Sequence, residues 1–405
     1  MKPILRAERM KPVHSDIRGP LYVEAMKRQK QGIDILKLNT GNPATFGFGL
    51  PDSIRNALME HMQDGVGYCD FKGMPQARQA ICDYETSKGI KGITPDDVFI
   101  GNGVSEVVSF ALTPLLNDGD EVLVPSPSYS LWGNSVYLED GKPVFYTCDE
   151  KAGWYPDIQD IRSKITDKTK AIVIINPNNP TGVLYPKEIL LEIIQVAREF
   201  GLLIFSDEIY DRLVMDGKQH ISLASLTEDV PVITLNGLSK SHCLCGYRCG
   251  WMVISGPREL TEDYRQGIIQ LTSLRLCANT MAQIVIPAAL DDMETPASMV
   301  RPGGRIYEQR EATVRELEKI DGLSFVKNDA AFYVFPKLDV KKFNITNDKQ
   351  FAHDLLDATN ILLVPGSGFD WKDPDHFRIV MLPQADILSD AIRRMGTFLD
   401  GYKQK

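Results

Sequence analysis

The sequence lacks the long apolar segments that a membrane protein needs. No uninterrupted apolar run in its 405 residues reaches the ~18 residues of a membrane-spanning helix. The N-terminal stretch that ends at Pro20 also lacks the apolar centre of a secretion signal. Together these absences predict a soluble protein of the cytoplasm that does not bind membranes.

Cysteine is sparse, and positive charge is in deficit. The seven cysteines are odd in number and scattered, which argues against a disulfide framework. They are Cys69, Cys82, Cys148, Cys243, Cys245, Cys249 and Cys277. Three lie near His242 with a spacing that fits no common zinc site, so we expect buried thiols in a tight loop and no metal. The formal net charge of −9 argues against binding to nucleic acid.

Short apolar runs alternate with helical stretches through the middle of the chain. The predicted strands cover 98–100, 121–124, 171–175, 202–205, 231–235 and 251–254. The most regular helical pattern between them covers 187–200. Strands that alternate with helices in this way predict an α/β fold with a mostly parallel sheet, of about seven strands.

The pattern changes after about residue 256. A helix at 305–319 precedes a predicted hairpin of strands 323–326 and 331–335. A helix at 348–358, strands at 361–364 and 377–381, and a last helix at 385–401 follow. We therefore predict a large domain at 46–290 and a smaller α+β domain at 291–405, to which an N-terminal arm at 1–45 is added.

Polar side chains follow the predicted strands at their C-terminal ends. Ligands of parallel sheets bind beyond the carboxyl ends of the strands, so these side chains are expected to converge on one cleft. They are Ser105, Tyr129, Asn179, Asp207, Tyr210 and Lys240. The glycine-rich turn at 101–106 also suits a phosphate, although Glu106 excludes a dinucleotide fingerprint.

Lys240 and Arg248 offer a specific chemistry at this cleft. Lys240 follows the strand at 231–235, and Arg248 lies between Gly246 and Gly250. A lysine amine forms a Schiff base with an aldehyde, and a guanidinium binds phosphate oxygens bidentately. Taken alone, these two residues are better explained by a surface lysine and an ordinary salt bridge, because most lysines are solvated.

Three motifs in a fixed order connect this chain with a known family. They are Asn176-Pro-x-Asn-Pro-Thr-Gly182, Asp207-Glu-x-Tyr210, and Ser239-Lys240 with Arg248 eight residues later. The set resembles the fold-type I, class I/II pyridoxal-phosphate aminotransferases. The resemblance extends over nearly the whole chain, from Asn39-Thr-Gly-Asn-Pro43 to Phe377-Arg-Ile379. Within the family, alanine-type members are the most similar, as in Asp16-Ile-Arg-Gly-Pro20.

The resemblance implies a role for each residue of the cleft. Lys240 would bind pyridoxal phosphate as a Schiff base and then move protons at the substrate Cα, while Asp207 would keep the pyridine nitrogen protonated. Further contacts to the cofactor are implied for Val104, Ser105, Tyr129, Asn179, Tyr210, Ser239 and Arg248. Tyr68 would reach the phosphate bound by the neighbouring subunit, which makes a homodimer the expected active unit.

The resemblance also implies how substrates bind. Arg378, Gly41 and Asn179 would hold the α-carboxylate. Arg18 in the arm would either meet the second carboxylate of glutamate and 2-oxoglutarate or form a structural salt bridge. The expected reaction converts L-alanine and 2-oxoglutarate to pyruvate and L-glutamate by ping-pong transfer.

Some residues depart from the pattern of the family. Ser15 stands where the alanine-type relatives carry a tyrosine, which weakens the substrate assignment. Cys243 and Cys249 replace small or aliphatic residues, which predicts unusual local packing. Aspartate, aromatic or branched-chain donors and a pyridoxal-phosphate C–S lyase remain alternatives. A non-enzymatic regulator would need a DNA-binding helix-turn-helix, for which no room precedes Pro20.

Overall fold

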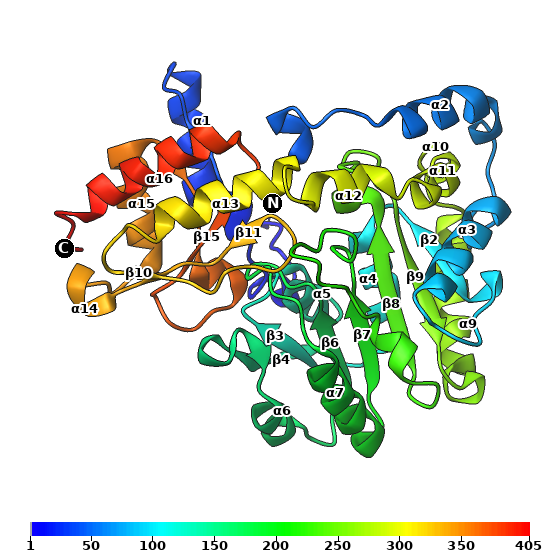
Figure 1. Cartoon of the computed structure of the whole chain (residues 1–405). Coiled ribbons are helices and arrows are strands. Elements are labelled where there is room, and N and C mark those ends of the chain that lie inside the picture. The colour runs from blue at the N-terminus through cyan, green and yellow to red at the C-terminus, as the bar shows by residue number, and fades with distance from the viewer. Residues whose placement is uncertain (1) are drawn as a thin grey trace.

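A computed structural model describes residues 2–405, so the first residue of the expected arm lies outside it. An eight-stranded sheet forms the centre, in the order β2-β9-β8-β7-β6-β3-β4-β5 (Figure 1). Its strands are β2 (Val98–Gly101), β3 (Glu121–Ser126), β4 (Lys142–Asp149), β5 (Tyr155–Pro156), β6 (Thr169–Ile175), β7 (Leu203–Asp207), β8 (Val232–Gly237) and β9 (Gly250–Ser255). Strands β4, β3, β6, β7 and β8 run parallel, and β9 is antiparallel to both of its neighbours. The sheet is therefore mostly parallel, with seven longer strands and the two-residue β5 at its edge.

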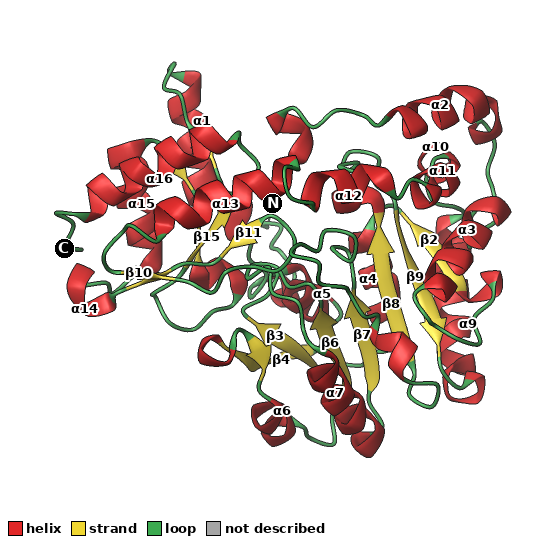
Figure 2. Cartoon of the chain, in the orientation of Figure 1, coloured by secondary structure: helices red, strands yellow, loops and turns green. Residues whose placement is uncertain are grey.

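Helices cover both faces of this sheet (Figure 2). On β6, Ala171, Val173 and Ile175 pack in one buried cluster with α4 (Val104–Leu112), α5 (Leu131–Leu138) and α9 (Arg258–Arg275). Ile172 and Ile174 pack in another with α6 (Ile158–Lys164) and α7 (Lys187–Phe200). Successive side chains of a strand point to opposite faces, so an uninterrupted apolar strand is what a doubly covered sheet requires.

Helix α7 has the bounds that its sequence predicts. Leu190, Ile193, Ile194 and Ala197 are buried, and this spacing places them on one face of a helix. The helix ends at Phe200, and Gly201 caps it with a left-handed φ of 66°. Glycine adopts this conformation without strain because it has no Cβ. Local periodicity and a glycine C-cap are enough to define this element.

Around the far edge of the sheet lies a group of shorter helices. They are α2 (Asp52–His61), α3 (Pro75–Ser87), α10 (Thr280–Ile284) and α11 (Ile286–Asp291), followed by α12 (Glu294–Val300). The apolar side chains of α2, α3, α10 and α11 share a buried cluster with Val98, Ile100, Trp251 and Val253 of β2 and β9. Among the described residues no single helix is long and apolar enough to cross a bilayer; only α9 taken with α10 and α11, across a 119° bend, reaches that length and composition.

The C-terminal third forms a second layered unit, at upper left in Figure 1. Its helices are α13 (Arg305–Leu317), α14 (Val340–Phe343), α15 (Asp348–Thr359) and α16 (Ala385–Leu399). Its strands are β10 (Leu323–Ser324), β11 (Tyr333–Val334), β12 (Lys337–Leu338), β13 (Ile361–Leu362), β14 (Val364–Pro365) and β15 (Phe377–Val380). The N-terminal segment joins this unit, because β1 (Leu36–Lys37) pairs in parallel with β13, and α1 (Pro20–Lys30) precedes it.

The structure corrects two predictions about strands. The expected hairpin of 323–326 with 331–335 is wrong, because β10 pairs with β12 and β11 pairs with β15. The intervening loop is held elsewhere, since the backbone N–H groups of Asp329 and Ala330 both donate to the carbonyl of Gly182. The sequence analysis also missed β4, whose burial alternates along its length.

Candidate active site

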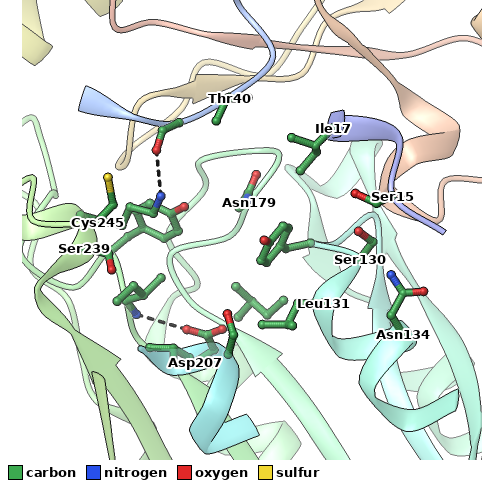
Figure 3. Close-up of a pocket in the computed structure, with 18 of the residues that line it drawn as sticks. Ser15, Ile17, Thr40, Ser130, Leu131, Asn134, Asn179, Asp207, Ser239 and Cys245 are labelled. Atoms are coloured by element: carbon green, nitrogen blue, oxygen red, sulfur yellow. Dashed lines mark hydrogen bonds between the residues drawn. The ribbon is translucent and has the colours of Figure 1, made fainter. Parts of the chain in front are cut away.

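A cavity of about 530 Å³ lies beyond the C-terminal ends of the parallel strands. It brings together the residues that were predicted for the cleft of this chain (Figure 3). Tyr68, which was expected to reach the site of a neighbouring subunit, does not line it. Those that line it are Arg18, Gly41, Val104, Ser105, Tyr129, Asn179, Asp207, Tyr210, Ser239, Lys240, Arg248 and Arg378. The expected convergence of separate strands on one cleft is therefore seen.

Asp207 ends β7 and is a buried carboxylate without a cationic partner in the described chain. It accepts hydrogen bonds from Trp132 Nε1 at 3.1 Å and from the backbone N–H of Ile209 at 3.4 Å. Burial raises the pKa of Asp207 to about 6, and the bond from Trp132 opposes this rise. A protonated ring nitrogen next to this carboxylate would supply the missing charge, which fits the pyridine of pyridoxal phosphate.

Lys240 is presented by the short helix α8 (Leu238–Ser241), directly after β8. Its Nζ donates a hydrogen bond to the carbonyl of Gly41 at 3.0 Å. Gly237 permits this placement because it has no side chain. A Cβ at that position would lie 2.5 Å from the carbonyl oxygen of Cys249, the residue directly before β9, and would collide with it. The strand pair β8–β9 can therefore run to the edge of the cavity and leave the lysine amine inside it.

Glycines also create a binding site for an anionic group. A Cβ on Gly103, whose φ is +86°, would collide with the guanidinium of Arg248, and a Cβ on Gly250 would collide with the backbone nitrogen of Val104. The guanidinium thus lies against the first turn of α4, which begins at Val104 and Ser105. Helix N-termini and guanidinium groups both favour phosphate oxygens, so this site fits the phosphate of the cofactor.

Arg248 itself has an unusual backbone. Its φ is 54°, a left-handed conformation that costs a non-glycine residue on the order of 1–3 kcal/mol. Its guanidinium donates to the Cys245 carbonyl at 3.1 Å, and it makes no ion pair within residues 2–405. The strained residue and its uncompensated charge both support a binding role.

Arg378 is a buried cation without a carboxylate among the residues described. It is 1% exposed, donates to Asn179 Oδ1 at 2.9 Å and to the Asn39 carbonyl, and its Nε has no partner. The guanidinium lies 4.6 Å from the ring centroid of Tyr333 and 4.6 Å from that of Phe369. Burial lowers the pKa of Arg378 because the charge is desolvated. A substrate carboxylate would satisfy both the charge and the free donor.

Two aromatic residues of the site were not predicted. Tyr333 lies 2.9 Å, oxygen to oxygen, from Tyr210, and burial raises the pKa of Tyr210 well above its usual value. Gly41 is close to the hydroxyl of Tyr333, since a Cβ on Gly41 would collide with that oxygen. Trp132 is the second, through its bond to Asp207. Tyr333 stands in the apolar run 331–335, which predicts a core residue, and no motif marks Trp132, so the sequence carried no signal for either.

Arg18 and Tyr68 occupy different positions. Arg18 lines the cavity together with Ser15 and Ile17 of the N-terminal segment. Ser15 and Ile17 lie on the side opposite Cys245 (Figure 3). In residues 2–405 Arg18 forms no ion pair, so the alternative of a structural salt bridge is not observed. Tyr68 is 84% exposed and lies outside the cavity. Val66, Leu274 and Leu276 are likewise exposed apolar side chains.

The three cysteines near Lys240 differ in environment. Cys245 lines the cavity, and its thiol donates to Asn42 Oδ1 at 3.1 Å. Cys249 is buried, and burial raises its pKa to about 12. Cys243 packs near Met299 with a φ of 59°, and burial likewise raises its pKa to about 12. The raised values describe neutral thiols that pack in a tight loop.

Comparisons with known proteins agree with this geometry. The family described as aminotransferase class I and II matches residues 33–392. The glutamate-pyruvate aminotransferase AlaA of Haemophilus influenzae is 49% identical over 404 residues and covers 100% of both chains. A crystal structure of an aminotransferase from Escherichia coli superposes with a TM-score of 0.98 at 46% identity, over 100% of both chains. The alanine aminotransferase of Pyrococcus furiosus gives a TM-score of 0.92 at 40% identity, over 98% of this chain and 100% of that one. This chain, with its fold and its lysine, aspartate and arginine site, belongs to the fold-type I family of class I and II aminotransferases.

Proposed function

We propose that this protein transfers the amino group of L-alanine to 2-oxoglutarate, which yields pyruvate and L-glutamate. The observation that carries the proposal is the charge of the cavity. It is lined by four cationic side chains, those of Arg18, Lys240, Arg248 and Arg378, and by one carboxylate, Asp207. A phosphorylated cofactor and a dicarboxylic substrate would together supply the anions that this set lacks.

Pyridoxal phosphate is the cofactor of this family, and the names of the relatives support the substrates. The H. influenzae relative is named a glutamate-pyruvate aminotransferase, and a relative from Mycobacterium bovis, 45% identical over 400 residues, is named an alanine aminotransferase. The latter match covers 98% of this chain and 93% of that protein. Both names include alanine or its keto acid, pyruvate.

Each residue of the cavity has a role in this proposal. When bound, pyridoxal phosphate supplies an electron sink for the electron pair left at the substrate Cα. The amine of Lys240 would remove the proton at Cα of the amino donor in the first half-reaction and deliver a proton to Cα of the new amino acid in the second, and Asp207 would hold a proton on the pyridine nitrogen. Tyr129 would stack on one face of the ring and shield it from water.

The remaining contacts orient the cofactor and the substrate. Since Asn179 Oδ1 already accepts from Arg378, its Nδ2 is left to donate to the ring oxygen, together with the Tyr210 hydroxyl. The Val104 N–H, Ser105, Ser239 and Arg248 would hold the phosphate. The α-carboxylate binds to Arg378 and to the N–H of Gly41, which is the same anchor for every amino acid.

Selection between substrates must therefore come from the other side of the cavity. Arg18 lines the cavity without an ion pair among the described residues, and its guanidinium suits the γ-carboxylate of glutamate and 2-oxoglutarate. Tyr129 narrows the space above the cofactor, which suits the methyl group of alanine. One cavity would in this way accept both a small and a dicarboxylic substrate.

An Arg18→Ala variant tests this assignment. It should raise KM for 2-oxoglutarate about 10–150-fold, since a charge-assisted hydrogen bond is lost, and change KM for pyruvate little. Both values are measured by steady-state kinetics in the two directions of the reaction. Equal effects on the two keto acids would show that Arg18 does not bind the second carboxylate. A preference for aspartate or aromatic donors over alanine in a single-turnover panel would overturn the substrate assignment.

We also propose that the active unit is a homodimer in the cytoplasm. Tyr68 is too exposed to serve the cavity of its own chain, and the exposed Val66, Leu274 and Leu276 support a covered surface. Mixed dimers of Tyr68→Phe and Lys240→Ala chains test this, because only sites that are shared between the two chains would recover activity.

The division into 1–45, 46–290 and 291–405 is part of the same proposal. It is supported by Leu38, which packs in one cluster with Leu317 and Phe351.

A further inference from the structure

Residues 11–18 of the N-terminal arm form one side of the cavity. Ser15, Ile17 and Arg18 line the cavity, and so does Asn134 of α5, which lies on the same side as Ser15 and Ile17 (Figure 3). Arg18 ends the short 3-10 turn Asp16–Arg18 and makes no ion pair within the described residues. Its position therefore depends on the contacts of its neighbours in the arm.

Among these neighbours, His14 contacts two separate parts of the chain outside the arm. Its backbone N–H donates to Asn134 Oδ1 at 3.1 Å, and Asn134 Nδ2 donates to the His14 carbonyl at 2.6 Å. Its ring Nε2 lies 3.0 Å from Oδ1 of Asp370, which follows the turn Gly366–Phe369. His14 is thus joined to α5 through its backbone and to the C-terminal unit through its side chain.

Two further contacts fix the residues between His14 and Arg18. Lys349 of α15 lies 3.2 Å from Asp16 Oδ1, and Asn39 Nδ2 donates to the Ile17 carbonyl at 2.8 Å. Asp16 also packs closely on Gly368, where a Cβ would approach the Asp16 side chain to 2.8 Å. The arm is therefore docked at successive residues, and His14 is the docking point whose charge depends on pH.

We propose that His14 is a positioning residue, which docks the arm on Asn134 and Asp370 and thereby holds Arg18 at the cavity for the second carboxylate of a dicarboxylic substrate. This inference rests on the proposed function, since it concerns the role assigned there to Arg18. It adds a residue that does not touch the substrate but determines how well the dicarboxylic substrate binds.

The groups around His14 set the pH at which docking is lost. Asp16 and Asp370 face its ring, Lys349 reaches it through Asp16, and α5 contributes the neutral Asn134. Tyr137 of α5 is close to Asp370. Hydrogen bonds to the two carboxylates raise the pKa of His14 from its ordinary value of 6.5 to about 9.

The sign of the pH effect follows from this shift. A raised pKa means that the protonated ring favours the docked arm. The contribution is complete below pH 6.5 and is lost as the pH rises through about 9. KM for 2-oxoglutarate should therefore rise over this window, whereas KM for pyruvate, which has no second carboxylate, should change much less.

The ratio of KM for 2-oxoglutarate to KM for pyruvate, measured on the holoenzyme from pH 6.5 to 9.5, tests the proposal. For the unchanged protein we expect the ratio to rise about fivefold, since His14 is partly exposed and its ion pairs are screened. In His14→Gln the ratio should be high at all pH values. The control is His353→Gln, which removes an exposed pair with Asp357 and should follow the unchanged protein.

A second readout does not depend on activity. Titration of the His14 ring by NMR in the full chain should give a pKa near 9, and Asp370→Asn should lower it and shift the rise in the KM ratio to lower pH. A ratio independent of pH in the unchanged protein, or equally pH-dependent in His14→Gln, would overturn the proposal. If Arg18→Ala raises the ratio while His14→Gln does not, the inference alone fails. If Arg18→Ala leaves the ratio unchanged, the proposed role of Arg18 fails as well.

Discussion

Two regions of the molecule differ in whether carboxylates neutralise a cation that is shielded from water. Lys88, at the end of α3, has a side chain that is 12% exposed and lies 2.6 Å from Glu85, 2.8 Å from Glu208 and 3.3 Å from Asp211. Arg378, in the cavity, is 1% exposed and has no carboxylate within the part of the chain that the structure describes. One cation is surrounded by an excess of negative charge, and the other is left without any.

The difference separates stability from binding. The Lys88 cluster is closed by further donors, since Tyr84 and Asn236 donate to Asp211 at 2.5 and 2.7 Å. Such a network can compensate the desolvation of its charges only while every member is present. The cations of the cavity have no carboxylate partners, which lowers the free energy of unfolding of the protein. An anionic cofactor and substrate raise it again when they bind. Variants of the two regions should therefore fail in different ways.

Lys240→Ala should have the largest effect on function and leave the fold intact. Loss of the proton-transfer group alone costs on the order of 10²–10⁴-fold in turnover, and loss of the covalent anchor adds to this. Turnover and thermal unfolding are measured side by side. Lys341→Ala, an exposed lysine of α14, serves as the control. Normal transamination by Lys240→Ala would contradict the proposed role.

Asp207→Asn should keep the cofactor bound but slow proton removal from the substrate Cα by about 10²-fold or more. The amide cannot stabilise a positive charge on the pyridine nitrogen. Exchange of the Cα proton with deuterated water reports the step directly. An unchanged rate would mean that another acid acts there. Glu208 is poorly placed for this, because its Oε1 accepts from Ser206 at 3.0 Å and from Ser222 at 2.8 Å, outside the cavity.

Lys88→Met should lower the free energy of unfolding by about 3–5 kcal/mol, because it leaves buried carboxylates without their cation. Chemical denaturation measures this change. The matched control is Lys91→Met, whose exposed pair with Glu228 should contribute no more than about 1 kcal/mol. Equal effects of the two substitutions would show that the cluster does not stabilise the fold.

In contrast to Lys88→Met, Arg378→Leu should impair substrate binding without lowering the stability of the fold. KM for every amino acid should rise about 10–150-fold, since all of them bind through the α-carboxylate. The free energy of unfolding of the cofactor-free protein should stay the same or increase, because an uncompensated charge is removed from the interior. Kinetics and denaturation of the same preparation test both parts. A marked loss of stability would mean that Arg378 is a structural residue like Lys88.

Much of the candidate site was accessible from the sequence for a simple reason. Parallel strands end at one edge, so Asn179, Asp207 and Lys240 had to meet once their strands were recognised. Tyr333 could not be found in this way, because its position in the apolar run 331–335 is that of a core residue. The same run also led to the wrong hairpin, since a strand pattern does not say which strand is its partner.

By itself, the sequence determined the order of the motifs, the alternation of strands and helices, and the bounds of α7, because these depend on residues a few positions apart. Only the tertiary structure decided which charges are neutralised. Lys88 meets Glu208 across 120 positions of the chain, and Arg378 meets Asn179 across 199. Electrostatic interactions depend on separation in space and on burial. Neither quantity can be read from positions along the chain, so the uncompensated cations that define the cavity became visible only in the fold.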